Sequence, residues 1–241
     1  MVKKAKKITR KELLNQPDEF LTLSSRLFQY TLEHKYQLLA ALGGLIALVL
    51  IISGVRYNSQ KKAEEAFARL EAGRSKYEAL LEDSGPRQAY EQVRADFQQL
   101  LQKYSGQTGG KFARLLFADI CYRAGQPDEA IELYNAATRD FDDPFYRHTI
   151  LNGLGYAYEE KQDLKKAVSY FQQVADSQDS VLKAEALFNT GRLYAALGEP
   201  EKSRQRFEQL TSEQPDSLYA GLARERTAQA SKPPIETPAS P

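Results

Sequence analysis

The 241-residue sequence predicts an all-α protein, with a single transmembrane helix followed by a stack of helical hairpins. Three observations lead to this prediction. Residues 38–55 form an apolar run without a charge. The rest of the chain has apolar residues at helical spacing and no run of alternating β-branched residues. Finally, one apolar pattern recurs along the chain with an offset of 36 residues.

The apolar run at 38–55 is long enough to cross a bilayer. A helix of this length spans about 27 Å, close to the hydrocarbon thickness of a membrane. Tyr36 and Tyr57 flank the run, and tyrosine favours the membrane–water boundary. A buried core helix is one alternative, but it would usually keep a polar stripe. A cleaved signal peptide is another, but the run exceeds a typical signal core and no small-residue cleavage site follows it. We therefore expect an uncleaved anchor.

The charge distribution bears on partners and orientation. Residues 1–37 carry a net charge of about +4 and the remainder about −3. Because the larger part is not basic, nucleic acid is not an expected partner. The basic cluster at the N-terminus favours a cytoplasmic N-terminus, although basic residues close to the run are more numerous on its downstream side.

The remaining segments are assigned from composition and periodicity. Residues 1–37 form a basic segment with an amphipathic helix, whose apolar face includes Leu23 and Leu27. Residues 56–86 are expected to form a connecting helix, and 87–230 a repeat domain. The proline-rich tail, 231–241, is expected to be disordered because it cannot bury apolar surface.

Within the repeat domain, two copies of the pattern match residue by residue. The first helix of each copy carries a glycine, Gly155 or Gly191, and the second carries an aromatic residue, Phe171 or Phe207. A glycine lets the second helix approach closely, and the aromatic ring fills the gap between hairpins. A third, weaker copy begins near Lys111, and a half-copy containing Phe97 precedes it. Each hairpin leaves an apolar face that the next one must cover.

This pattern resembles the tetratricopeptide repeat, whose period is about 34 residues. The resemblance covers roughly 87–230, with good copies at 148–181 and 184–217. In the third copy, Arg114 and Cys121 depart from the apolar type that the family prefers. The layout is also similar to a bacterial group that includes the ancillary subunit of the Sec translocon. That resemblance implies the inner membrane, a cytoplasmic N-terminus and a periplasmic repeat domain forming a right-handed solenoid.

The resemblance also implies a function in protein binding, as a scaffold or chaperone-like accessory subunit in translocation or envelope assembly. Partners would be proteins, such as the Sec translocon or periplasmic chaperones, and the membrane would be contacted through one helix. The first helices of the hairpins would line a groove for an extended peptide or a partner helix. The residues expected to face this groove are Phe112, Leu115, Asp119, Tyr122, Asn152, Tyr156, Glu159, Phe188 and Arg192.

A structural role is the alternative. The apolar run contains small residues at the spacing that lets membrane helices pair, Ala40 with Gly44 and Gly43 with Ala47. A homo-oligomeric envelope or division component without a client groove would fit this spacing.

Catalytic chemistry is not indicated. The two histidines, His34 and His148, are separated by the apolar run, and the sequence has no cysteine pair or His/Glu helix motif for a metal. The stretch from Ser105 to Lys111 resembles a phosphate loop, but Ser105 replaces its leading glycine and Phe112 replaces the magnesium-binding Ser or Thr. We therefore expect no enzyme activity, no cofactor and no metal.

Overall fold

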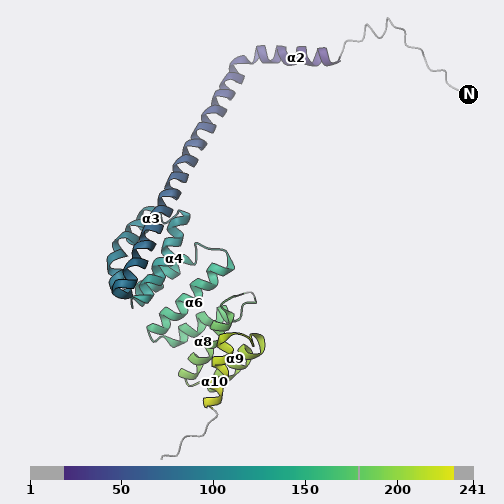
Figure 1. The fold of residues 1–241 in the computed structure, drawn as a ribbon. Coiled ribbons are helices and arrows are strands. Elements are labelled where there is room, and N and C mark those ends of the chain that lie inside the picture. Colours follow the sequence, from purple (N-terminus) through teal and green to yellow (C-terminus); the bar gives the residue numbers. More distant parts are fainter. Residues whose placement is uncertain (1–18, 179, 231–241) are drawn as a thin grey trace, which may run out of the picture. The chain divides into compact units, whose positions relative to one another are not determined.

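The computed structural model describes residues 19–178 and 180–230, and within these ranges the regular structure is entirely helical (Figure 1). The chain divides into two compact units, the first ending at Gln60 and the second beginning at Lys61. Residues 1–18 of the predicted basic segment and the predicted proline-rich tail, 231–241, lie outside the described residues. The helices are α2 Glu19–Glu33, α3 Lys35–Tyr104, α4 Thr108–Arg123, α5 Pro127–Ala137, α6 Pro144–Glu160, α7 Leu164–Ala175, α8 Lys183–Ala196, α9 Pro200–Glu213 and α10 Leu218–Ala230.

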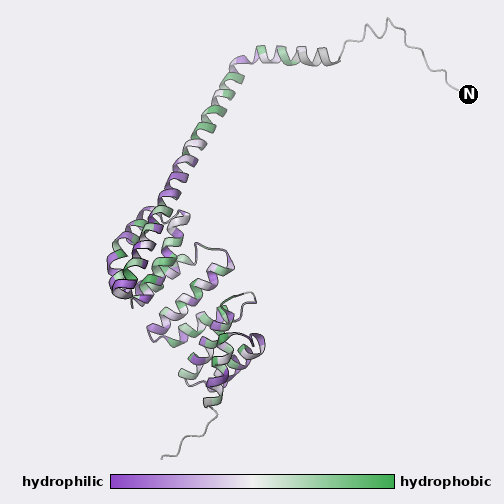
Figure 2. Cartoon of the chain, viewed as in Figure 1, coloured by the Kyte–Doolittle hydropathy of each residue, from purple (hydrophilic) through white to green (hydrophobic). Residues whose placement is uncertain are grey.

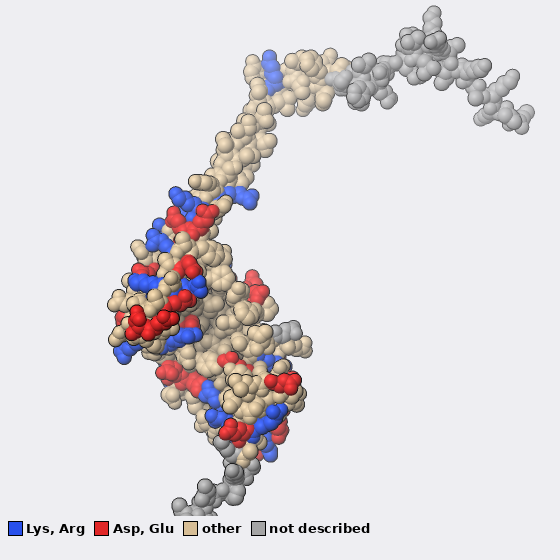
Figure 3. Space-filling view, in the orientation of Figure 1, with Lys and Arg blue, Asp and Glu red and all other residues tan. Residues whose placement is uncertain are grey.

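The first unit contains α2 and the apolar part of α3. Figure 2 shows this part of α3 as a hydrophobic stretch, and Figure 3 shows it without charged side chains. None of its most apolar window is buried, so the alternative of a core helix is not supported. By length and composition this helix is able to cross a membrane. On α2, Leu27 and Phe28 are also exposed, while the side chain of Leu23 is not described.

The second unit begins with a hairpin made from the rest of α3. At Gly85 the backbone leaves the helical region with a φ of 76°, and residues 61–84 and 86–104 form the two arms. The arms pack together, since a Cβ placed on Gly73 would lie 3.2 Å from the ring of Phe97. The sequence pattern shows only half a copy here, and the structure supplies the other half.

Three further hairpins follow, α4 with α5, α6 with α7 and α8 with α9, and α10 comes last (Figure 1). The turn inside each hairpin places one residue in the left-handed region. Gly125 and Gly198 occupy this position with φ values of 73° and 75°, and Gln162 does so with a φ of 61°. Glycine adopts this conformation without steric cost, so Gln162 is the strained member of the set.

The predicted close approach of the second helix at the glycine is confirmed, and the group that meets each glycine is the aromatic ring of the same hairpin. A Cβ on Gly155 would lie 2.7 Å from the ring of Phe171, and one on Gly191 would lie 2.6 Å from the ring of Phe207. Real Cβ atoms essentially never come so close, so any larger residue at either position would force the ring or the helices to shift. Phe171 itself is fully buried.

The two departures from the family pattern have structural reasons. Arg114 forms an ion pair with Asp140, which follows α5, and both side chains are largely buried. Burial lowers the pKa of Arg114, yet the carboxylate partner supplies the counter-charge that a buried cation needs. Cys121 is fully buried and behaves as a small apolar residue, and burial raises the pKa of its thiol.

Candidate protein-binding wall

Side chains from α6 and α8 form a hydrogen-bonded network between neighbouring hairpins. Three of the residue pairs that hydrogen-bond across this interface are 33 positions apart, three fewer than the sequence repeat, and a fourth pair, Tyr156 with Glu185, is 29 positions apart. We call this network, together with the tyrosine of α4 whose ring lies beside Tyr156, the first-helix wall. It consists of Tyr122, Asn152, Tyr156, Glu159, Glu185, Asn189 and Arg192.

Tyr156 lies at the centre of the wall. Its hydroxyl donates to Glu185 Oε1 at 2.5 Å and accepts from Asn189 Nδ2 at 2.8 Å. Asn152 Nδ2 donates to the same Glu185 oxygen at 3.2 Å. Burial, and next the hydrogen bond to Glu185, raise the pKa of Tyr156, so the phenol stays protonated as a donor.

The second polar group of the wall is an ion pair. Arg192 donates to both carboxylate oxygens of Glu159, in the bidentate geometry that gives the strongest pairs, and to Asn189 Oδ1 at 3.1 Å. The two charged side chains are only 23% and 24% exposed. The hydrogen bond to Glu159 raises the pKa of Arg192, which keeps the pair fully charged.

Aromatic rings extend the wall at both ends. Towards α4, the rings of Tyr122 and Tyr156 lie 6.0 Å apart. Towards α10, the ring of Phe188 lies 5.7 Å from that of Tyr219, and the guanidinium of Arg226 lies 5.7 Å from the Phe188 ring. The first helices of successive hairpins are thus joined by side-chain contacts from α4 to α10.

The structure brings together most of the residues expected in the groove. Five of the nine, Tyr122, Asn152, Tyr156, Glu159 and Arg192, belong to the first-helix wall, and Phe188 lies one helical turn from Glu185 on α8. These side chains hold one another and so form a preorganised surface.

The other three predicted residues have different surroundings. Asp119 accepts a hydrogen bond at 2.7 Å from Arg123 of its own helix. Leu115 packs against the core. Phe112 belongs to a separate aromatic cluster, with its ring 5.1 Å from Phe141 and 5.3 Å from Tyr146.

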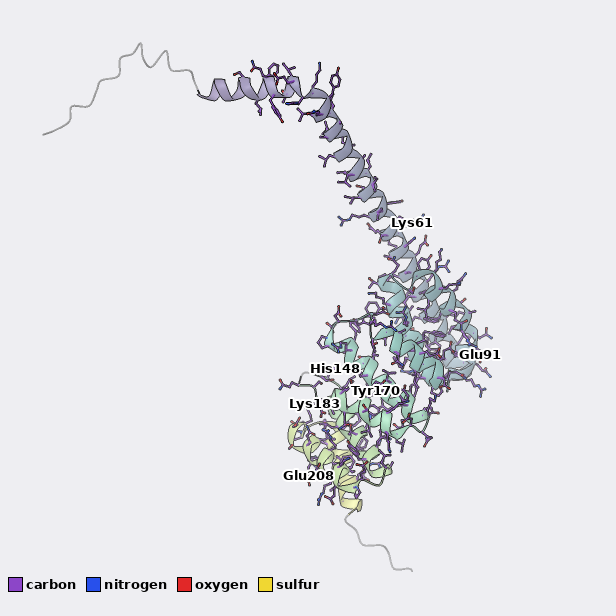
Figure 4. The ribbon with its side chains drawn as sticks, turned by 180° about the vertical axis from the view of Figure 1, so that it is seen from behind. Lys61, Glu91, His148, Tyr170, Lys183 and Glu208 are labelled. Atoms are coloured by element: carbon purple, nitrogen blue, oxygen red, sulfur yellow. The ribbon has the colours of Figure 1, made fainter. Side chains whose placement is uncertain are left out.

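Sequence reasoning missed Glu185 and Asn189. A signal was present, because Glu185, Asn189 and Arg192 have the same i, i+4, i+7 spacing on α8 as Asn152, Tyr156 and Glu159 have on α6. The offset of 33 is not visible in the repeat itself, which is set by the core residues. Lys183, labelled in Figure 4, lies in the first turn of α8 and forms an ion pair with Glu213 of α9 at 2.7 Å.

Two buried polar atoms lack partners among the described residues, Asn152 Oδ1 and the hydroxyl of Tyr77. Asn152 is 8% exposed and its other amide atom faces Glu185. Across residues 19–178 and 180–230, no group of His, Cys, Asp and Glu is arranged to hold a metal ion. The first-helix wall offers hydrogen-bonding groups, charges and aromatic rings, which are the groups that protein–protein interfaces use for recognition.

Comparisons with known proteins agree with this architecture. Models of the tetratricopeptide repeat match residues 79–144 and 146–212. No curated protein matches the chain. Among solved structures, a tetratricopeptide repeat protein from Parabacteroides merdae is similar at 20% identity with a TM-score of 0.52, covering 65% of this chain and 58% of that one. The chain therefore spans less than two thirds of that relative's length.

A Podosopora anserina chain with nearly identical TPR-like repeats has 16% identity and a TM-score of 0.51, covering 69% of this chain and 89% of that one. At these identities the structural likeness shows the fold alone. The comparisons contain nothing that identifies a subunit of the Sec translocon. The family models, the Gly–aromatic contacts and the stacked hairpins agree, and the chain belongs to the tetratricopeptide repeat proteins.

Proposed function

We propose that this protein is a membrane-anchored scaffold that binds a polypeptide partner on the first-helix wall. The observation that carries the proposal is the preorganised network around Tyr156, which joins α4, α6 and α8. Tetratricopeptide repeats generally bind proteins, and aromatic rings with fixed polar groups suit a peptide or a partner helix.

The binding function is tested by site-specific photocrosslinking in cells. A photoreactive residue at Asp119, beside the wall and with a 40% exposed side chain, should capture a defined protein. The control position is Lys165 on α7, which is exposed and belongs to a second helix. Recovery of the same proteins from both positions contradicts a binding role for the wall.

The anchoring part of the proposal rests on residues 38–55, which are apolar, exposed and long enough to cross a bilayer. The resemblance to the Sec ancillary group supports the inner membrane, with the N-terminus cytoplasmic and the repeats periplasmic. Protease added to intact spheroplasts should then digest the repeat domain. Protection of the repeats until the membrane is lysed would reverse the proposed orientation.

Self-association through the apolar helix is a second candidate function. Space is free around Gly43 and Gly44, where an added Cβ would meet nothing within 4 Å, so another helix is able to approach there. If pairing uses this face, Gly44→Leu should convert a dimer to a monomer in detergent. A wild-type protein that is already monomeric excludes this role.

A further inference from the structure

One carboxylate in the first-helix wall has no cationic partner. Among the described residues, Glu185 contacts the neutral donors Tyr156, Asn152 and Tyr219 and forms no salt bridge. The other carboxylates on this face are paired, Glu159 with Arg192 and Asp119 with Arg123. Glu185 is therefore the place where this face has negative charge to offer.

The surroundings of Glu185 offset this charge only in part. It lies in the first turn of α8, where the helix dipole supplies about half an elementary charge. The nearby cations are engaged elsewhere, since Lys183 pairs with Glu213 and Arg226 lies over the ring of Phe188. Glu185 is half-buried rather than closed off, so an incoming cation reaches it from solvent.

A second, independent observation points to a missing donor. Asn152 is more than nine-tenths buried, its Nδ2 bonds the Glu185 carboxylate, and its Oδ1 has no partner. Buried polar atoms normally have hydrogen-bond partners, so an N–H group that reaches this acceptor would make a hydrogen bond that the protein leaves unmade. The hydroxyls of Tyr156 and Tyr219 both hydrogen-bond to the Glu185 carboxylate, so two aromatic side chains border the same place.

We propose that Glu185 and Asn152 form a receptor for a basic side chain, a lysine or arginine carried by the polypeptide that binds the wall. This inference rests on the proposed protein-binding function and specifies the chemistry of the partner. A carboxylate and an amide oxygen beside two tyrosine side chains together match a lysine ammonium or an arginine guanidinium. An acidic or purely apolar segment would leave the Glu185 charge without a counter-charge and Asn152 Oδ1 without a donor.

The test is selection from a phage-displayed library of random peptides of about twelve residues on the full-length protein in nonionic detergent. Three proteins are compared, the wild type, Glu185→Gln and Glu91→Gln. Glutamine at 185 keeps an oxygen that accepts from Tyr156 but removes the charge. Glu91, labelled in Figure 4, is exposed on α3 and serves as the charge-matched control. Circular dichroism melts confirm that all three are folded.

We expect wild type and Glu91→Gln to enrich peptides with lysine or arginine, and Glu185→Gln to lose this enrichment. A selected peptide should bind Glu185→Gln about tenfold more weakly than wild type. Replacing its basic residue by glutamine should weaken binding to wild type by a similar factor, with no further loss against Glu185→Gln. The comparison of the basic peptide with its glutamine version needs only the wild-type protein, so it tests the proposal even if Glu185→Gln unfolds.

Two other outcomes overturn the proposal and are distinguishable. Selection of peptides without basic enrichment, or enrichment that survives Glu185→Gln, excludes the cation receptor while peptide binding stands. If none of the three proteins selects a peptide, the wall does not bind extended peptides, and the proposed receptor for a basic side chain is contradicted as well.

Discussion

The two units of the chain carry their apolar side chains in opposite ways. In the first unit, the side chains of Leu50 and Ile51 are 67% and 64% exposed, and their neighbours along the apolar helix are also exposed. In the second, Phe97 and Phe171 are at most 1% exposed. The residue types are similar, but one segment is apolar on all sides and the others are apolar on one face. A helix of the first kind suits lipid, and helices of the second kind suit one another.

The largest effect is expected from a substitution that makes the apolar helix of the first unit unsuited to lipid. Replacing both Ile46 and Val49 by arginine should cost about 6 kcal/mol of membrane insertion, since each arginine near the centre costs about 3 kcal/mol. The protein should move from the carbonate-resistant pellet to the supernatant. The control is Leu222→Arg on α10, a partly exposed residue of the second unit, which should stay in the pellet. Pellet retention by the double variant would contradict anchoring.

The next effect lies in the second unit. Phe171→Ala removes a fully buried ring between hairpins and should lower the free energy of unfolding by about 3–5 kcal/mol. Urea titration followed by circular dichroism measures this loss, while carbonate extraction should be unchanged. Val181→Ala, at a position that is 77% exposed, is the control and should change stability by less than about 0.5 kcal/mol. A small loss at Phe171 would show that the stacked core is not the source of stability.

A single methyl group sharpens the comparison further. Gly155→Ala should cost about 1–3 kcal/mol, because the new Cβ would meet the Phe171 ring at 2.7 Å. Gly221→Ala on α10 meets nothing within 4 Å and should be neutral or gain up to about 1 kcal/mol from helix propensity. Equal effects of the two substitutions in the same urea titration would argue against the close approach of α6 and α7.

The smallest expected effect concerns the turn at Gln162. Gln162 has a φ of 61°, in the left-handed region. Gln162→Gly should raise the free energy of unfolding by about 0.5 kcal/mol, because the backbone strain that it relieves exceeds the conformational entropy that glycine adds to the unfolded chain. The reciprocal change, Gly125→Gln, should lower it by about 1 kcal/mol, because its φ of 73° is also left-handed. If both changes destabilise, the turns are not equivalent.

Much of the fold follows from spacing. Gly155 with Phe171 and Gly191 with Phe207 are each 16 residues apart, and this regularity by itself predicts two hairpins. The first hairpin does not show the same regularity, because Gly73 and Phe97 are 24 residues apart. Its two arms are longer than those of the other hairpins, so the spacing differs while the contact is of the same kind.

The candidate site was predictable in part. Tyr156 and Glu159 were expected to face the groove from the family resemblance, and the structure places both in the first-helix wall. Glu185 was missed because its role depends on a partner one hairpin away. Phe112 was also expected in the groove, and its ring lies against Phe141 in the connection after α5 and against Tyr146 in the first turn of α6. Loop contacts of this kind leave no periodic trace in the sequence.

The sequence by itself determined the apolar run, the all-α class and the core of the repeats, because each depends on local periodicity and side-chain type. Only the tertiary structure decided which polar groups meet across hairpins, such as Tyr156 with Glu185, and which are left without a partner, such as Asn152 Oδ1. The physical reason is the distance along the chain over which each interaction acts. Burial acts on each residue through its own helix face, whereas a hydrogen bond requires two atoms from distant segments to come within about 3 Å.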